Sequence, residues 1–168
     1  MKNFLLYYSF HINVIIISLI IYYCPAYAET GFQKDISSFI DSYLLGNIGL
    51  ISDNRPFLSK VIGNYVALNS IFLGIVLYVF KVIPYKNNQE PSPCYLVGMI
   101  FITLICFYFT FFSNVIFKVP QKSYINILPD SLIMYGLVVI ACFFMSTIGI
   151  SMILYFLVKT KSFIELIK

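Results

Sequence analysis

Four long stretches of the chain contain no charged residue, and this pattern constrains the fold more than any other feature. The stretches cover residues 3–28, 61–80, 91–117 and 131–158. A helix needs about 20 residues to cross a hydrocarbon core roughly 30 Å thick, and a charge at its centre costs about 2.5–3.5 kcal/mol on insertion scales. Each stretch is long enough to cross. The predicted membrane spans lie near residues 4–23, 62–80, 94–117 and 131–158.

The apolar runs are continuous and lack the alternation of a barrel strand, which favours helices over a β-barrel. The sequence therefore predicts an all-α integral membrane protein, a bundle of four transmembrane helices forming a single domain over residues 1–168. Composition agrees, because 60% of the residues are hydrophobic and 11% are charged, whereas soluble domains average about 45–50% and about 25%. This composition excludes a disordered chain and argues against a soluble enzyme.

The first stretch has a second interpretation. Ala26-Tyr27-Ala28 before Glu29 resembles a signal-peptidase site, and the apolar part, residues 14–23, is short for a membrane span and typical of a signal peptide. The polar side chains that argue against a signal peptide are Ser9, His11 and Asn13. We expect residues 1–28 to be retained as a helix, and a cleaved signal peptide is the alternative.

The basic residues stand singly at the borders of the apolar stretches. They do not gather on one face, which argues against nucleic-acid binding. With four spans and the N-terminus inside, the inner six are Lys2, Lys81, Lys86, Lys159, Lys161 and Lys168, and the outer five are Lys34, Arg55, Lys60, Lys118 and Lys122. The inner residues crowd near helix ends, so positive-inside counting places both termini in the cytoplasm. The loop of residues 29–60 is then external and faces the periplasm of a bacterium.

This external loop contains a pattern of apolar residues with helical spacing. They are Ile36, Phe39, Ile40, Tyr43 and Leu44. The spacing predicts a short amphipathic helix at the membrane surface, ended by Gly46 and Gly49.

No motif for catalysis, metal binding or cofactor binding is present. The four cysteines, Cys24, Cys94, Cys106 and Cys142, form no Cys-x-x-Cys, and His11 is the only histidine. A lone histidine cannot build a usual zinc site, and cysteines beside spans behave as small apolar residues. All seven acids lie outside the predicted spans, which argues against a proton or cation path. We expect no enzymatic activity, no metal and no cofactor.

The predicted spans contain uncharged polar side chains, which are the candidate functional residues. Such residues let helices approach closely and bond across the contact. They either hold the chain's own bundle together or grip the helices of another protein, and both interpretations stay open. The candidate partner-contact residues are Asn64, Asn69, Ser70 and Asn114.

Two segments carry a more specific pattern. The first is Arg55-Pro-Phe-Leu-Ser-Lys-Val-Ile-Gly-Asn-Tyr65, followed by Ile71-Phe-Leu-Gly-Ile-Val-Leu-Tyr-Val-Phe-Lys81, and the second is Asp130-Ser-Leu-Ile-Met-Tyr135. They resemble the immunity proteins of pore-forming colicins, of the colicin A and colicin B type, in which a Pro and a Tyr precede an apolar run that ends in a basic residue. The resemblance covers most of the chain from about residue 10 onward. The N-terminus here lacks the long charged lead of that type, and the second loop has fewer basic residues.

The resemblance implies a function without catalysis. Immunity proteins of this type lie in the inner membrane of the colicin-producing bacterium, recognise the C-terminal channel domain of the toxin as it inserts, and block channel opening. The implied partners are therefore a pore-forming colicin and the lipid bilayer. Recognition is helix–helix contact within lipid, in which small and polar residues decide which partner fits.

A second function is compatible with the same sequence. If residues 1–28 are a cleaved signal peptide, three spans remain, as in a small membrane subunit of a secretion or conjugation channel. The fate of the Ala28–Glu29 bond distinguishes the two functions. A small membrane enzyme or carrier is disfavoured, because no charged residue lies inside any predicted span.

Overall fold

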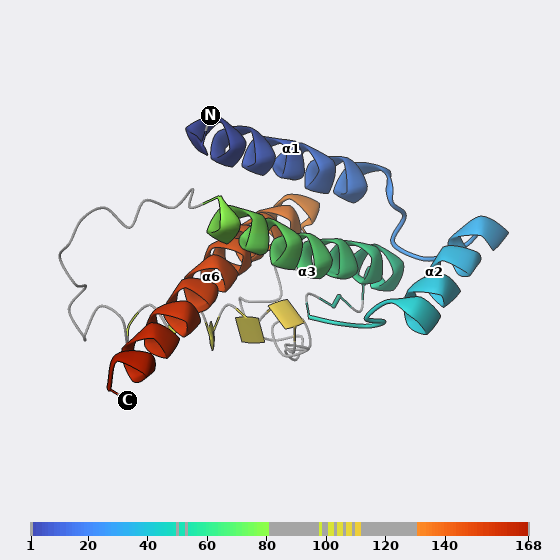
Figure 1. Ribbon diagram of the computed structural model, residues 1–168. Helices are drawn as coiled ribbons and strands as arrows, with labels where there is room; N and C mark the ends of the chain where they lie inside the picture. Colours follow the sequence, from blue (N-terminus) through green and yellow to red (C-terminus); the bar gives the residue numbers. More distant parts are fainter. Residues whose placement is uncertain are drawn as a thin grey trace.

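The computed structural model describes residues 2–49, 51–52, 54–80 and 131–167, together with residues 98, 101–102, 104–105, 107–108 and 110–111. Within these residues the chain is all-α and contains no strand, as predicted. The helices are α1 (Lys2–Tyr23), α2 (Gly31–Tyr43), α3 (Pro56–Val79) and α6 (Leu132–Ile167). Figure 1 shows α1 and α3 side by side, α6 crossing α3 obliquely, and α2 beyond the end of α3 where α3 begins.

Two of these helices are long and apolar enough to cross a membrane. They are α3 over its full length and α6 over Leu132–Tyr155. A shorter apolar stretch, Tyr8–Tyr23, lies in α1. The third predicted span, 94–117, lies largely outside the described residues, although those described between 101 and 111 are helical. The membrane-type composition of two helices is thus present, and the four-span bundle stays a prediction.

The helices extend beyond the predicted spans. Helix α3 begins at Pro56 rather than near residue 62, and α6 continues to Ile167 rather than ending near residue 158. Pro56 occupies the first turn of α3, where its missing N–H costs no hydrogen bond. Charges limit how much of a helix can enter lipid, but they do not end the helix. The charge-free stretches therefore indicate which part of a helix could lie in lipid, and they do not give the residues at which the helix begins and ends.

Local signals set both ends of α2. At its start, the Thr30 hydroxyl accepts a hydrogen bond from the Gln33 amide at 3.3 Å, while the Gln33 side chain accepts one from the Thr30 amide at 3.0 Å. This reciprocal arrangement is a capping box. At its end, the Ile40 carbonyl accepts from the amides of Leu44 and Gly46, and Gly46 has a φ of 63°. The predicted amphipathic helix is confirmed as a helix.

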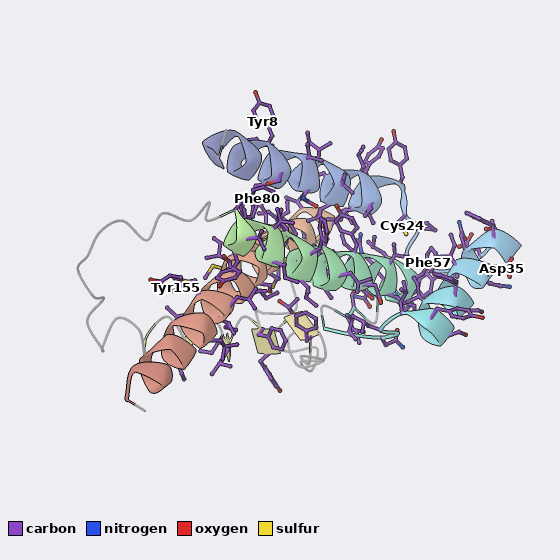
Figure 2. The ribbon with its side chains drawn as sticks, in the orientation of Figure 1. Tyr8, Cys24, Asp35, Phe57, Phe80 and Tyr155 are labelled. Carbon is purple, nitrogen blue, oxygen red and sulfur yellow. The ribbon has the colours of Figure 1, made fainter. Side chains whose placement is uncertain are left out.

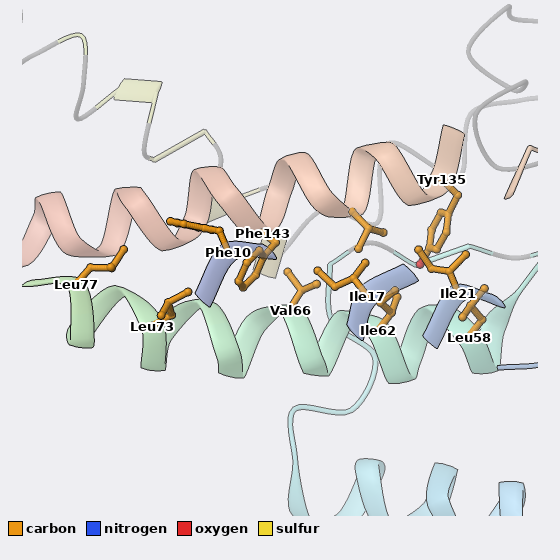
Figure 3. Close-up of a cluster of buried hydrophobic side chains, with 11 residues drawn as sticks. Phe10, Ile17, Ile21, Leu58, Ile62, Val66, Leu73, Leu77, Tyr135 and Phe143 are labelled. Carbon is orange, nitrogen blue, oxygen red and sulfur yellow. The ribbon is translucent and has the colours of Figure 1, made fainter. Parts of the chain in front are cut away.

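The core joins α1, α3 and α6. Its buried members are Phe10, Ile17 and Ile21 of α1, Leu58, Ile62, Val66, Leu73 and Leu77 of α3, and Tyr135, Val139 and Phe143 of α6 (Figure 3). Most neighbours within each set are three or four positions apart, so each helix buries one stripe. Helices α3 and α6 make the most extensive contact.

Close contacts fix the directions of the three helices. Gly74, toward the end of α3, lies against α6, where an added Cβ would stand 2.9 Å from the Ile150 side chain and 3.0 Å from the Thr147 carbonyl. A Cβ on Gly136, at the start of α6, would stand 3.2 Å from Ile21, near the end of α1. Figure 3 shows Ile21, Leu58 and Tyr135 together at one end of the core, whereas Leu77 lies toward the other end. Helix α6 therefore runs in the same direction as α3 and opposite to α1.

Candidate functional site

Asn64 joins α3 to the loop that follows α2. Its Oδ1 accepts from the Leu45 amide at 3.0 Å, and its Nδ2 donates to the carbonyls of Gly46 at 2.7 Å and Lys60 at 2.9 Å. The side chain is buried, with 2% of its surface exposed. These bonds employ both ends of the amide inside the chain, so the structure gives Asn64 a role in holding the loop onto α3.

Lys60 joins α3 to α2 itself. Its ammonium donates to the Ser37 hydroxyl at 2.9 Å and to the Asp41 carboxylate at 2.8 Å. Phe57, one turn earlier, is buried where α2 meets α3 (Figure 2). The pair is partly exposed, and such ion pairs contribute about 0–1 kcal/mol. Its effect is mainly to fix how α2 lies across the start of α3.

Asn69 belongs to a group of three polar side chains between α1 and α3, which we call the Asn13 cluster: Asn13, Tyr65 and Asn69. The Tyr65 hydroxyl donates to Asn13 Oδ1 at 2.6 Å, and Asn69 Nδ2 donates to the same oxygen and to the Tyr65 hydroxyl. Asn13 Nδ2 donates to the Ser9 carbonyl at 2.8 Å. The cluster therefore bonds α1 to α3 at a depth where the surrounding side chains are apolar.

The two other predicted contact residues are Ser70 and Asn114. Ser70 is fully buried, and its hydroxyl donates to the Ala67 carbonyl at 3.0 Å. Asn114 lies outside the described residues. None of these positions is shown to contact another protein, and partner contact stays a prediction for all four. For Asn64, Asn69 and Ser70, the bonds within the chain support the interpretation that they hold the bundle together.

A further polar contact connects α6 to the third predicted span. The hydroxyls of Thr110 and Ser146 lie 2.6 Å apart, and both are buried. Next to them, the Thr147 hydroxyl donates to the Phe143 carbonyl at 2.8 Å. Hydroxyl pairs of this kind are typical contacts between helices in lipid.

The outward faces of the helices are apolar. On α3 the exposed residues Leu68, Phe72, Ile75 and Val79 follow one another at helical spacing. Helix α1 exposes Ile12, Ile15 and Leu19, and α6 exposes Ile133 and Leu137. These stripes are the surface that lipid or the helices of a partner would cover. Asn69 stands at the edge of the α3 stripe, one residue after Leu68.

The titratable groups of the described residues bear on two possible sites, a metal site and a reactive thiol. No group of three or more His, Cys, Asp or Glu side chains is close enough to hold a metal ion in that part of the chain. Neither Cys24 nor Cys142 is in a disulfide there. Burial raises the pKa of the Cys24 thiol, which lowers its reactivity as a nucleophile.

Of the Asn13 cluster, sequence reasoning named Asn69 as a candidate and missed Asn13 and Tyr65. Tyr65 and Asn69 are four residues apart and therefore share a face of α3, and this signal was available. Their partner Asn13 is separated from them by 52 and 56 residues. Only the packing of α1 against α3 reveals that pairing. The capping box at Thr30 was also missed, although its Thr-x-x-Gln pattern stands in the sequence.

No family model, no curated protein and no solved structure matches this chain.

Proposed function

We propose that the chain is an inner-membrane immunity protein that binds the channel domain of a pore-forming colicin and blocks channel opening. The observation that carries this choice is the integration of α1 into the bundle. Phe10, Ile17 and Ile21 pack into the shared core, and Asn13 bonds to Tyr65 and Asn69. A retained first helix is what the immunity function requires, whereas the secretion-subunit function removes it.

The directions of the helices support four spans. Because α3 and α6 run in the same direction, a chain that leaves α3 in a bilayer has to cross back before α6 begins. The charge-free stretch around residues 94–117 is long enough for that crossing. With α1 running opposite to α3, the count becomes four spans with both termini on one side.

The linker between α1 and α2 bears on the alternative function. Residues 24–30 are not helical, and Tyr27 is exposed, which suits a peptidase site. However, the Ala26 carbonyl accepts a hydrogen bond from the Phe57 amide at 3.0 Å, which ties the linker to the first turn of α3. A secretion or conjugation subunit with a cleaved signal remains the second candidate, and the mass of the mature N-terminus decides between them.

Among the exposed apolar stripes of α1, α3 and α6, we assign the stripe on α3 to contact with the toxin. Leu68, Phe72, Ile75 and Val79 offer an apolar stripe, and Asn69 adds a polar group at its edge. Phe72 has 67% of its surface exposed, so its ring is free to pack into a partner helix. Helices in lipid recognise one another by such packing, with polar groups adding selectivity.

Protection is the experiment that tests the function. The chain is expressed in a sensitive bacterium and challenged with a panel of pore-forming colicins, while potassium efflux and survival are followed. We expect protection against one toxin and not its relatives. Absence of protection against the whole panel, with the chain present in the inner membrane and its N-terminus beginning at Glu29, would overturn the immunity function in favour of the secretion subunit.

The same assay tests the assigned face. Phe72→Ala is expected to lower the tolerated toxin concentration about tenfold, which corresponds to about 1.4 kcal/mol of contact energy. Leu137→Ala, on the exposed face of α6, is the matched control and should leave protection unchanged. Equal loss of protection in both variants would contradict a specific role for α3.

A further inference from the structure

Helix α2 buries only one edge of its apolar face. Ile40 is 4% exposed and lies on the side that meets α3, the side where Lys60 bonds to Ser37 and Asp41. A second set of side chains is exposed: Phe32 by 75%, Phe39 by 54% and Tyr43 by 77%. We call this set the α2 aromatic stripe. Packing against α3 therefore accounts for only part of the apolar face.

The α2 aromatic stripe forms one continuous surface. Positions 32, 39 and 43 are seven and four residues apart, which places them on the same side of a helix. The rings of Phe39 and Tyr43 lie 5.2 Å apart between centroids. The exposed residues Lys34, Asp35 and Ser38 occupy the remaining sides. The outer part of α2 is thus amphipathic in its own right.

The position of α2 indicates what covers the stripe. It is connected to the end of α1 by residues 24–30 and bonded to the first turns of α3 through Lys60, so it lies at one end of the bundle. It runs crosswise to α1 and α3 (Figure 1). The end of α1 carries Tyr22 and Tyr23, which are 76% and 75% exposed. Exposed tyrosines at helix ends are typical of the boundary between lipid and water.

We infer that α2 is an interfacial helix whose aromatic stripe is immersed in the headgroup region of the bilayer. This inference needs α1 and α3 in a membrane, but it is independent of any toxin. The polar side of α2 carries one cation and one carboxylate at Lys34 and Asp35, and the carboxylate of Asp41 is paired with Lys60. Attraction to the bilayer therefore comes from the rings and not from charge, and ionic strength should not affect it.

The chain contains no tryptophan, so a single introduced tryptophan reports its own surroundings. Phe39→Trp and Phe32→Trp place the reporter on the stripe, and Ser38→Trp places it on the polar side as the matched control. Each full-length variant is reconstituted into phosphatidylcholine vesicles that contain phosphatidylcholine brominated near the headgroup end of its acyl chains. We expect blue-shifted emission and quenching about twofold or more stronger for the two stripe variants than for the control, at low and at high salt alike.

Three results would overturn the inference. Water-like emission without quenching in both stripe variants would show that the stripe faces solvent. Blue-shifted emission without bromine quenching would show that protein, such as a second copy of the chain, covers it. Equal quenching at all three positions would show that α2 has no defined orientation at the interface.

Discussion

The amide of Asn13 is bonded at both ends, through Nδ2 within its own helix and through Oδ1 to two side chains of α3. Such bonds between helices in lipid contribute about 0.6 to 2 kcal/mol each. The Asn13 cluster also fixes which face of α1 meets α3. Apolar side chains can pack in many ways, but Asn13 Oδ1 can accept from both Tyr65 and Asn69 in few relative positions of the two helices. At the residue scale, this contact supports the proposal that α1 is retained.

Asn69→Leu and Asn13→Leu together separate a structural role from a contact role. Both variants break the Asn13 cluster and should lower the free energy of unfolding by about 1–2 kcal/mol. If Asn69 also contacts the toxin, only Asn69→Leu should lower the tolerated toxin concentration, by about tenfold. The measurements are unfolding in mixed detergent and the protection assay. Equal loss of protection in both variants would assign Asn69 to the bundle alone.

Cys24 provides a prediction about pH. Burial raises the pKa of its thiol, so the folded state favours the neutral thiol. The resulting stabilisation is present below the unfolded-state pKa and is lost as the pH rises through the folded-state pKa. With the other cysteines replaced, maleimide should react several-fold more slowly at Cys24 than at an introduced Ser38→Cys, and the Cys24 rate should keep rising at higher pH. Identical pH profiles at the two positions would contradict this.

At the scale of the helices, the sequence pattern indicates apolar periodicity and capping residues. It does not indicate where most helices end or which helices pack together. The spacing around Ile36 to Tyr43 correctly predicted α2. The start of α3 at Pro56 was not predicted, because the charge-free stretch begins only after Lys60. Asn64 and Ser70 were named as uncharged polar residues of a predicted span, but their partners lie in a loop and within α3 itself, and a sequence pattern does not show such bonds.

Gly74 tests the contact between α3 and α6. Gly74→Ala introduces a Cβ against Ile150 and the Thr147 carbonyl, both closer than ordinary contact. Because the Thr147 carbonyl is backbone, the helices have to separate, and we expect a loss of about 1–3 kcal/mol in the free energy of unfolding. Gly31→Ala is the matched control, since nothing lies within 4 Å of the added atom. A control variant as unstable as Gly74→Ala would refute the packing explanation.

At the scale of the whole molecule, α1 is antiparallel to α3 and α3 is parallel to α6. What remains to be determined is which side of the membrane faces the cytoplasm. The proposed four spans place α2 on one side of the membrane and both termini on the other. In a background without native cysteines, an impermeant maleimide should label Ser38→Cys in intact spheroplasts and Lys168→Cys only after lysis. Labelling of Lys168→Cys before lysis would reverse the orientation.

The Asn13 cluster also has a consequence for synthesis. Asn13 emerges from the ribosome 52 residues before Tyr65 and 56 residues before Asn69. At about 5–20 residues per second, this separation corresponds to roughly 3–11 s. Throughout that interval the Asn13 carbonyl oxygen has neither of its partners, while its amide nitrogen already has the Ser9 carbonyl. A helix with an unmet acceptor is less soluble in hydrocarbon, so under the proposed four-span arrangement we expect α1 to become more stable in the bilayer once α3 is inserted beside it.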